Sequence, residues 1–531
     1  MKPDVIVVGS GMAGAPSAWF LANKGYSVLI IEGGEYISPA QLPTSSIDWE
    51  AKKNSQFNPV ASGRTNIGDF PVNDKASPIA VCNFNAVGGS SLLYSAHFPR
   101  FLSTDFRIRE LEGVGKDWPI DYKGLLPFFD LNDEMVAVAG KVGDPYYPEI
   151  KKVFNPPVSL GIAGETLAKG FDDLNLHWWP SLAAINTAQN LPGRLRCHGL
   201  GPCNTGCPTG AKGTVNNTYL ANLPKERATI LSETTVSKIL FDGDKTVGVE
   251  VVNALGRADR IFCSNVILAA GAIGTPRVLL NSLLGSELLN KIPGQNLIGK
   301  NLMMHPLGYA EGYFPDKKLY SERGPQGVIL YSLEYYRPKE KVNFDLGFMI
   351  HALRGDSPVN AMKGLYARRK LKFGPDVYSQ FNEHFGRSMG IAIICEDLPD
   401  VANKVELDQT KDKLGLPGVK INYALSENSK RMISFGLKKA REVLHAAGAK
   451  KSSGFGPIRN TGWHLFGTAC MGDDPTTSVV DSFGGVHGVK GLFVVDASVF
   501  VTSSCVNPAN TIQALSLYLA SKIDERMRHA H

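Results

Sequence analysis

The stretch that decides the fold is Val5–Gly14, which reads VIVVGSGMAG. Its first four residues are apolar and β-branched, as expected of a central parallel strand that is buried on both faces. The loop that follows has the spacing Gly-x-Gly-x-x-Gly, with its glycines at Gly9, Gly11 and Gly14. Because an apolar helical pattern comes next, the stretch predicts the first strand, loop and helix of a Rossmann-type dinucleotide-binding unit.

The three glycines have separate mechanical roles. Gly9 permits the tight turn, Gly11 lets the backbone approach a pyrophosphate, and Gly14 lets helix and strand pack closely. The helix N-terminus offers its N–H groups and its positive dipole end to the phosphates. Glu32 ends the second predicted strand, where it can accept hydrogen bonds from the adenosine ribose and repel the extra phosphate of NADP. The motif alone leaves FAD and NAD both open as the ligand.

Length and composition bound the class of protein. A chain of 531 residues is too long for one ordinary core, so we expect two intimately joined domains. With 43% hydrophobic and 20% charged residues, the chain is not disordered, collagen-like or a coiled coil. The net charge of +6 is spread without a basic block, which argues against nucleic acid as a partner.

The ends of the chain and its apolar runs bear on location. No apolar run reaches the roughly 18 residues that a spanning helix needs, so we expect no transmembrane segment. The first strand begins too soon after Met1 to leave room for a signal peptide. We therefore expect a cytoplasmic protein, with a periplasmic location by co-export with a partner left open.

Nucleotide signals recur along the chain. A second glycine-rich turn lies at 85–91, short β-like runs fill 229–270, and glycine-rich turns return in the last seventy residues. Residues 101–195 look irregular, and 306–455 lack nucleotide signals and suit a substrate-facing sheet. The sequence thus predicts an α/β fold in which one nucleotide domain is assembled from separated segments and the substrate domain is inserted between them.

These segments, in this order, resemble the glucose–methanol–choline (GMC) oxidoreductase family of FAD enzymes, and essentially the whole chain is covered. The chain looks most like bacterial FAD sugar and gluconate dehydrogenases and pyranose-oxidase-like members. The matching motifs are GGSS at 88–91, AGAIGTP at 270–276, NLIGKNL at 296–302 before His305-Pro306, HLFGTACMG at 464–472 and VNPANT at 506–511.

The resemblance implies two domains with the isoalloxazine ring of FAD between them. One is a Rossmann-type FAD domain assembled from discontinuous segments. The other is an α+β substrate domain with a large, mostly antiparallel sheet. The expected FAD segments are 1–45, 80–100, 196–305 and 460–531, and the expected substrate segments are 46–79, 101–195 and 306–459.

The resemblance also implies a set of FAD contacts, with Val236 near the adenine and Asp496 by the ribityl-phosphate region. The expected cofactor-binding residues are Gly9, Gly11, Met12, Ala13, Gly14, Glu32, Gly33, Gly88, Gly89, Ser90, Ser91, Val236, Ala270, Gly271, Asp496, Ala497, Asn507 and Thr511. Relatives that tether FAD covalently have a histidine where this chain has Leu93. Because an aliphatic side chain cannot form that bond, we expect FAD to be noncovalent.

By the same resemblance, His464 and Asn507 are the catalytic pair. His464 is expected to take the proton of a sugar or glycoside hydroxyl while hydride passes to flavin N5, and Asn507 to hold the oxygen. Imidazole suits the first role because its unperturbed pKa is about 6.5. Asn510 lies one helical turn from Asn507 and competes for the second role. The other histidines that we considered are interpreted as structural; they are His97, His177, His305, His351, His384, His445 and His487.

The expected enzyme is a GMC-type alcohol or sugar dehydrogenase, and an oxidase that reduces O2 to H2O2 is the alternative. Three cysteines, Cys197, Cys203 and Cys207, lie in one glycine-rich loop, which is typical of iron–sulfur ligation. Their spacing resembles that of bacterial FAD dehydrogenases whose 3Fe–4S cluster passes electrons to a cytochrome. A plain loop, a disulfide, or zinc with His198 stay open as alternatives. With a cluster, we expect a small subunit and a cytochrome as partners besides the sugar or alcohol substrate.

Overall fold

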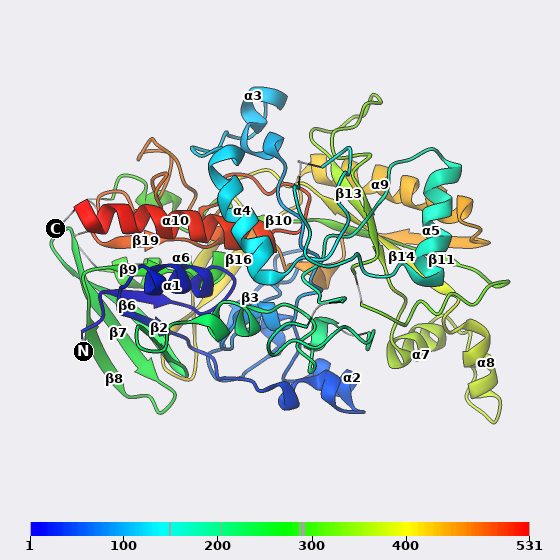
Figure 1. Ribbon diagram of the computed structural model, residues 1–531, viewed down its shortest axis with the longest axis horizontal. Coiled ribbons are helices and arrows are strands. Elements are labelled where there is room, and N and C mark those ends of the chain that lie inside the picture. Colours follow the sequence, from blue (N-terminus) through cyan, green and yellow to red (C-terminus); the bar gives the residue numbers. More distant parts are fainter. Residues whose placement is uncertain are drawn as a thin grey trace.

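The computed structural model describes residues 2–529 except 148–149, 189, 202, 286–287, 289–291 and 326. The molecule is elongated, with a parallel sheet toward one end and a large antiparallel sheet toward the other (Figure 1). Residues of both sheets line one cavity.

The parallel sheet has the strand order β19-β9-β1-β2-β5. Its centre is β1 (Val5–Val8), which is buried along its whole length and pairs with β2 (Val28–Ile31) and β9 (Val266–Leu268). The outer strands are β5 (Ala228–Leu231) and β19 (Leu492–Val494). Three distant parts of the chain thus meet in one sheet, which confirms a Rossmann-type unit built from discontinuous segments.

Helices pack beside this sheet. α1 (Gly14–Asn23) contacts α10 (Ala509–His529), and α10 contacts α4 (Tyr122–Val136), so the first and last helices of the chain lie side by side (Figure 1). α6 (Gly271–Leu283) packs against a separate three-stranded meander. The strands of the meander are β6 (Thr234–Asp242), β7 (Lys245–Asn253) and β8 (Ala258–Phe262).

The antiparallel sheet has the order β17-β11-β14-β13-β12-β4, and every neighbouring pair is antiparallel. Its strands are β4 (Trp179–Pro180), β11 (Leu307–Tyr313), β12 (Leu330–Ser332), β13 (Phe348–Leu353), β14 (Ser388–Cys395) and β17 (Lys451–Phe455). α9 (Glu427–Ala446) packs on this sheet and against α5 (Gly161–Asp173). This confirms the predicted large antiparallel sheet.

Two smaller sheets complete the strands, and the first joins β3 (Val72–Asn73) to β16 (Pro417–Asn422) and β15 (Lys404–Lys411). The second pairs β10 (Met303–Met304) with β18 (Leu465–Phe466). The remaining α-helices of the described residues are α2 (Trp49–Lys53), α3 (Ile108–Glu112), α7 (Pro358–Ala367) and α8 (Val377–His384). Among them and the longer helices described, none is both long and apolar enough to cross a lipid bilayer.

One expectation about local structure was wrong, and one helix was missed. Residues 101–195 were expected to be irregular, but they contain α4 and α5. Proline was the misleading signal, since Pro127 lies inside α4, whose N-terminus is capped by Asp121 through its Oδ1 and the N–H of Gly124 at 2.8 Å. The turns expected near the C-terminus are followed by the 21-residue α10, which the sequence reading missed. The domain boundaries themselves stay a prediction.

Candidate active site

A cavity of about 590 Å³ extends from the glycine loop of the parallel sheet to the antiparallel sheet. Most of the predicted site residues line it, from both ends of the chain. These are Gly9, Gly11, Met12, Ala13, Glu32, Gly33, Gly89, Ser90, Val236, Ala270, Gly271, His464, Asp496, Ala497 and Asn507. The predicted residues outside its lining are Gly14, Gly88, Ser91, Thr511 and the three cysteines of the loop.

The first glycine loop leaves room for a phosphate group. Gly9 has φ of +100°, and a Cβ on Gly14 would lie 1.9 Å from the Gly9 carbonyl oxygen. Within the described chain, no atom lies within 4 Å of the Cβ position of Gly11, and no side chain caps the first turn of α1. Since a helix N-terminus with open N–H groups binds anions, this end of the cavity fits the pyrophosphate of a dinucleotide.

Ser10 is a residue that the sequence analysis missed, although it lies inside the motif. Its N–H and Oγ donate to Glu32 Oε2 at 2.9 and 2.7 Å, and its Oγ accepts from the N–H of Gly88 at 3.0 Å. Burial raises the pKa of Glu32, and the hydrogen bonds from Gly34 and Ser10 oppose that shift. Ser10 therefore fixes the predicted ribose-binding carboxylate and connects it to the second glycine turn.

Gly88 and Ser91 support the second glycine turn from behind. Ser91 Oγ donates to the Gly88 carbonyl oxygen at 2.7 Å and accepts from the N–H of Val215 at 3.2 Å. Gly89 and Ser90 of this turn reach the cavity, as does the buried side chain of Leu93. The turn thus divides into residues that face the cavity and residues that hold it in place.

Asp496 lines the cavity and connects the start of α6 to Ser498. Its Oδ2 accepts from the Gly271 N–H at 2.8 Å and the Thr275 hydroxyl at 2.5 Å, while its Oδ1 accepts from the N–H and hydroxyl of Ser498. Burial raises its pKa. Thr511, outside the cavity, accepts from the N–H of Phe101 at 3.0 Å.

Strand register brings two histidines face to face. β10 and β18 pair antiparallel with Met304 opposite Leu465, so the next residues outward, His305 and His464, are also opposite each other. Their Nδ1 atoms are 2.9 Å apart, and His305 Nε2 lies 3.1 Å from the carbonyl oxygen of Ser503. His305, interpreted as structural from sequence, is therefore in direct contact with the predicted base.

The carbonyl of Ser503 fixes every proton in this chain of contacts, because a carbonyl oxygen only accepts hydrogen bonds. His305 must donate through Nε2, which leaves the lone pair of a neutral ring on Nδ1. His464 then donates through Nδ1 and keeps its own lone pair on Nε2. That atom is 3.2 Å from Asn507 Nδ2, whose amide oxygen faces His97 Nδ1 at 2.7 Å. His464 is thus held as the tautomer that a base needs.

Asn507 rather than Asn510 faces His464. Asn510 Nδ2 donates to Asp133 Oδ1 at 2.8 Å, and its Oδ1 accepts from Asn132 at 2.8 Å. Asn510 is buried in this contact and does not line the cavity. The two candidates left by the sequence are therefore separated by their surroundings.

Burial keeps all four histidines of the site neutral. It lowers the pKa of His97 and of His305 to about 4, and it lowers the pKa of His464 and of His351 well below the usual 6.5. Repulsion between protonated imidazoles lowers the pKa of His464 further. The contribution of His305 is larger than that of His97. A lone pair on His464 is therefore available throughout the neutral range.

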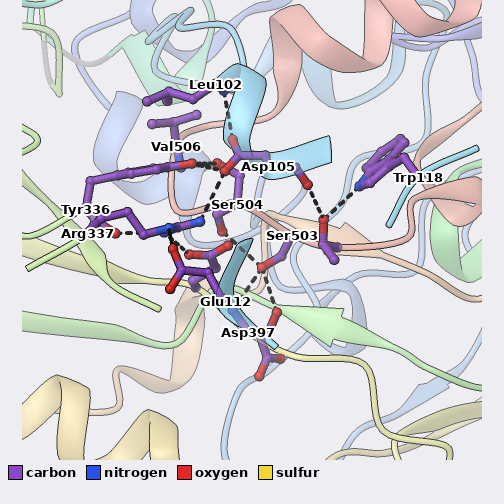
Figure 2. Close-up of polar contacts among 12 residues, drawn as sticks. Leu102, Asp105, Glu112, Trp118, Tyr336, Arg337, Asp397, Ser503, Ser504 and Val506 are labelled. Carbon is purple, nitrogen blue, oxygen red and sulfur yellow. Dashed lines mark hydrogen bonds and ion pairs between the residues drawn. The ribbon is translucent and has the colours of Figure 1, made fainter. Parts of the chain in front are cut away.

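The segment before Asn507 is anchored by buried polar groups (Figure 2). Ser503 Oγ donates to the carbonyl oxygen of Asp397 and accepts from its N–H at 2.8 Å. Ser504, with φ of +57°, lies near Tyr336, whose hydroxyl donates to Asp105. Burial, and then the nearby carboxylate of Glu396, raise the pKa of Asp105 to about 7. These contacts hold an unfavourable backbone conformation three residues before the predicted catalytic amide.

Arg337 supplies the positive charge of this buried group (Figure 2). It pairs with Glu396 at 2.8 Å, Glu112 at 3.3 Å and Asp105 at 3.6 Å. For Asp105, burial and then the charge of Glu396 outweigh the opposing effect of Arg337, so its carboxyl group retains a proton up to near neutral pH.

The cysteine loop does not form a metal site among the residues described, which omit 202. There, no three His, Cys, Asp or Glu side chains come together as ligands. Burial raises the pKa of Cys197, which opposes the thiolate that a cluster needs. The expectation of a 3Fe–4S cluster is therefore not supported.

A buried lysine holds the cysteine loop instead. Lys212 Nζ donates to the carbonyl oxygens of Leu92 at 2.8 Å, Tyr94 at 2.9 Å and Cys203 at 2.6 Å. The Lys212 N–H also approaches the sulfur of Cys207 at 3.5 Å. The loop is thereby connected to the segment that follows the second glycine turn.

The fold and the site define an oxidoreductase with a Rossmann-like nucleotide domain. Residues 7–41 match the NAD(P)-binding Rossmann-like domain, and residues 180–307 and 399–516 match the two GMC oxidoreductase models. The chain is 33% identical to 2-methyl-1,2-propanediol dehydrogenase of Mycolicibacterium austroafricanum, over 99% of this chain and 96% of that protein. The chain belongs to the GMC oxidoreductase family.

More distant relatives include named oxidases and dehydrogenases. Paromamine 6'-oxidase of Streptomyces fradiae is 27% identical over 98% of this chain and 91% of its own length. Fructose dehydrogenase large subunit of Gluconobacter japonicus is 23% identical over 98% of both chains. Pyridoxine 4-oxidase from Mesorbium loti shares the fold, with a TM-score of 0.64 at 17% identity over 99% of both chains.

Proposed function

We propose that the protein is an FAD-dependent dehydrogenase that oxidises a hydroxyl of a sugar or glycoside to a carbonyl, with His464 as the base. The observation that carries the proposal is the lone pair on His464 Nε2, fixed by the contacts to His305 and Asn507 in a cavity shared with the glycine loop. The named relatives act on hydroxyl-bearing compounds, as fructose dehydrogenase and the propanediol dehydrogenase indicate by their names.

The residues of the cavity fit FAD. The open space beside Gly11 and the uncapped start of α1 would hold the pyrophosphate, and Glu32 would accept from the ribose hydroxyls. Leu93 lines the cavity with an aliphatic side chain, which supports noncovalent binding. When bound, FAD supplies the acceptor of the substrate hydride.

The reacting hydroxyl would bind where it can reach both catalytic side chains, His464 and Asn507. Its proton would pass to His464 Nε2, while its oxygen would accept a hydrogen bond from Asn507 Nδ2, which already lies beside that nitrogen. As His464 gains the proton, its Nδ1–H becomes a stronger donor to His305, so the new positive charge is stabilised by a charge-assisted hydrogen bond. The amide of Asn507 cannot take the proton itself, which leaves His464 as the acceptor.

The alternative is an oxidase that reduces O2 to H2O2 on a sugar or another alcohol. It is favoured by the oxidases among the relatives, such as paromamine 6'-oxidase. The two functions differ in the acceptor, so peroxide formation in air is compared with dye reduction under argon. Fast dye reduction with little peroxide supports the dehydrogenase, and stoichiometric peroxide supports the oxidase.

The test of the proposed function is a spectrum followed by a substrate panel. Purified protein should show flavin absorption, and acid or heat should release the flavin into solution because no covalent bond holds it. Sugars, glycosides and simple alcohols are then screened with an artificial acceptor. A flavin that stays with the precipitated protein would contradict noncovalent binding, and a silent panel would contradict the enzyme proposal.

A further inference from the structure

Two buried imidazoles of the cavity wall have a nitrogen without a partner. His97 and His351 are 1% and 3% exposed, and both line the cavity that contains His464. Within the part of the chain that the structure describes, neither Nε2 atom has a hydrogen-bond partner. The two rings stack with their centroids 4.2 Å apart and an angle of 23° between their planes. Two unpartnered polar atoms thus lie on neighbouring rings.

Both nitrogens are acceptors. His97 Nδ1 is 2.7 Å from the amide oxygen of Asn507, so the proton is on Nδ1 and the lone pair is on Nε2. For His351, the nearby carbonyl oxygen of Gly327 favours a proton on Nδ1, because Nε2 has no partner. The lone pair of His351 is therefore also on Nε2. Burial lowers the pKa of both rings, so neither becomes a donor near neutral pH.

An acceptor that is buried without a donor is rare in folded proteins, because its desolvation is not compensated. Here two occur together in the wall of the candidate active site. A ligand hydroxyl that donates to one of the two nitrogens would remove this cost for that nitrogen, whereas a hydrocarbon group would leave both without a donor. The pair therefore selects for a polar, hydrogen-donating group on the substrate.

Asn507 gives the position of that group. Its amide nitrogen contacts His464, where the reacting hydroxyl is to bind, and its amide oxygen contacts His97. The amide of Asn507 and the ring of His97 thus lie between the reaction site and the first acceptor, His97 Nε2, and the ring of His351 stacks on that of His97. The two acceptors therefore face a part of the substrate other than the hydroxyl that reacts.

Resting on the function proposed above, we propose that His97 and His351 form a binding site for a second hydroxyl of the substrate, so that the substrate class is compounds with more than one hydroxyl. His464 and Asn507 bind the hydroxyl that reacts, and the pair of imidazoles binds another hydroxyl of the same molecule. His351 has no hydrogen bond to the catalytic pair, and its replacement therefore tests substrate binding with the least disturbance of the chemistry.

The experiment compares matched compounds that differ by one hydroxyl: 1,2-propanediol with 1-propanol, and D-glucose with 2-deoxy-D-glucose. The holoenzyme is assayed with an artificial acceptor as wild type, His351→Phe and His351→Gln. Phenylalanine keeps the ring stack and removes the acceptor, while glutamine keeps an acceptor at a similar reach. Flavin absorption and melting temperature show that each variant is folded and loaded.

We expect wild-type kcat/KM to be roughly 10- to 100-fold higher for the compound with the extra hydroxyl, the range set by one buried hydrogen bond. His351→Phe should lower this ratio toward one, mainly by raising the KM for the compound with the extra hydroxyl. His351→Gln should restore part of the ratio. If the ratio of kcat/KM values is the same in wild type and His351→Phe, the inference is overturned. Turnover of any compound in the panel would still support the proposed function.

A binding measurement decides the matter without turnover. In the His464→Ala holoenzyme, we measure how far 1,2-propanediol and 1-propanol, at equal concentrations, raise the melting temperature. A larger shift for the diol that disappears in His464→Ala/His351→Phe supports the hydroxyl-binding pair. Equal shifts for both compounds overturn it, even if every activity assay is silent and the proposed function has failed.

Discussion

The two ends of the cavity are built in opposite ways. At the end formed by Val5–Gly14, one short stretch of chain supplies a strand, a turn and a helix start, and the expected ligand contacts are backbone groups. At the other end, His97, His305, His464 and Asn507 come from four separate segments and act through side chains. Binding at the first end depends on glycines, which leave the backbone accessible. Chemistry at the second end depends on which ring nitrogen of each histidine carries the proton.

The difference indicates which end of the cavity determines the specificity of the chemistry. A glycine loop binds any dinucleotide phosphate, since the N–H groups of a helix start are the same in every protein. The hydrogen-bonded series from Ser503 through His305 to His464 has one proton arrangement. It begins at a carbonyl oxygen, which only accepts, so the proton position on His305 determines the proton position on His464. Substitutions at the two ends should therefore affect different measurements.

The largest effect is expected for His464→Ala. Removal of the base should lower kcat by about 10³-fold, within the range for general base catalysis, and leave flavin content unchanged. Steady-state kinetics and the flavin-to-protein absorbance ratio measure the two effects. His384→Ala, a substitution on α8 outside the cavity lining, is the matched control and should have wild-type kinetics. A near-normal rate in His464→Ala would remove the distinction between the two ends.

His305→Phe should have the next largest effect. It removes the acceptor of the His464 Nδ1–H, and a hydrogen bond to a charged group contributes about 1.5–3 kcal/mol, so kcat should fall roughly 10- to 100-fold. Flavin affinity should not change. His305→Asn, which can place an amide oxygen near the same proton, should recover part of the rate. If kcat is unchanged in a folded His305→Phe, the proton arrangement derived from Ser503 is wrong.

Gly14→Ala and Gly11→Ala test the backbone end. The new Cβ at Gly14 would lie 1.9 Å from the Gly9 carbonyl oxygen, so we expect a loss of about 1–3 kcal/mol in the free energy of unfolding, as for overpacked sites. At Gly11 the space is open, so stability should be retained and only flavin affinity should fall. Denaturant unfolding of the apoprotein and flavin titration separate the two. Equal losses of stability would contradict the geometry of the loop.

The smallest effect concerns stability against pH. Burial lowers the pKa of His351 well below 6.5. Below pH 6.5, His351 is therefore protonated in the unfolded chain and stays neutral in the folded protein. This histidine therefore costs stability as pH falls from 6.5, by up to about 1.4 kcal/mol per pH unit. Asp105 and Asp397, whose pKa values burial raises to about 7, act in the opposite direction.

The quantity to measure is therefore the difference in unfolding free energy between wild type and a His351 variant. Unfolding free energies of wild type and His351→Phe are compared between pH 7 and 5, so that the contributions of the two aspartates cancel. The variant should lose less stability than the wild type as the pH falls. Parallel curves would show that His351 titrates normally in the folded protein.

The same contrast explains what the sequence could predict. β1, α1 and β2 follow from local patterns, because strand, turn and helix lie within thirty residues or so of one another. His305 was beside a recognised motif, yet its partner His464 is 159 positions away, and His97 is 410 positions from Asn507. No local pattern records such pairings, and an isolated histidine looks the same whether it is buried in a core or facing a base.

The contacts of Lys212 have a consequence for local unfolding. Its ammonium ties the carbonyls of Leu92 and Tyr94, just after the second glycine turn, to that of Cys203 in the cysteine loop. The two segments cannot open separately without leaving a buried charge unpartnered, so they behave as one cooperative unit. Amide hydrogens of both segments should therefore exchange with similar rates, and flavin that protects the first segment should also slow exchange in the second.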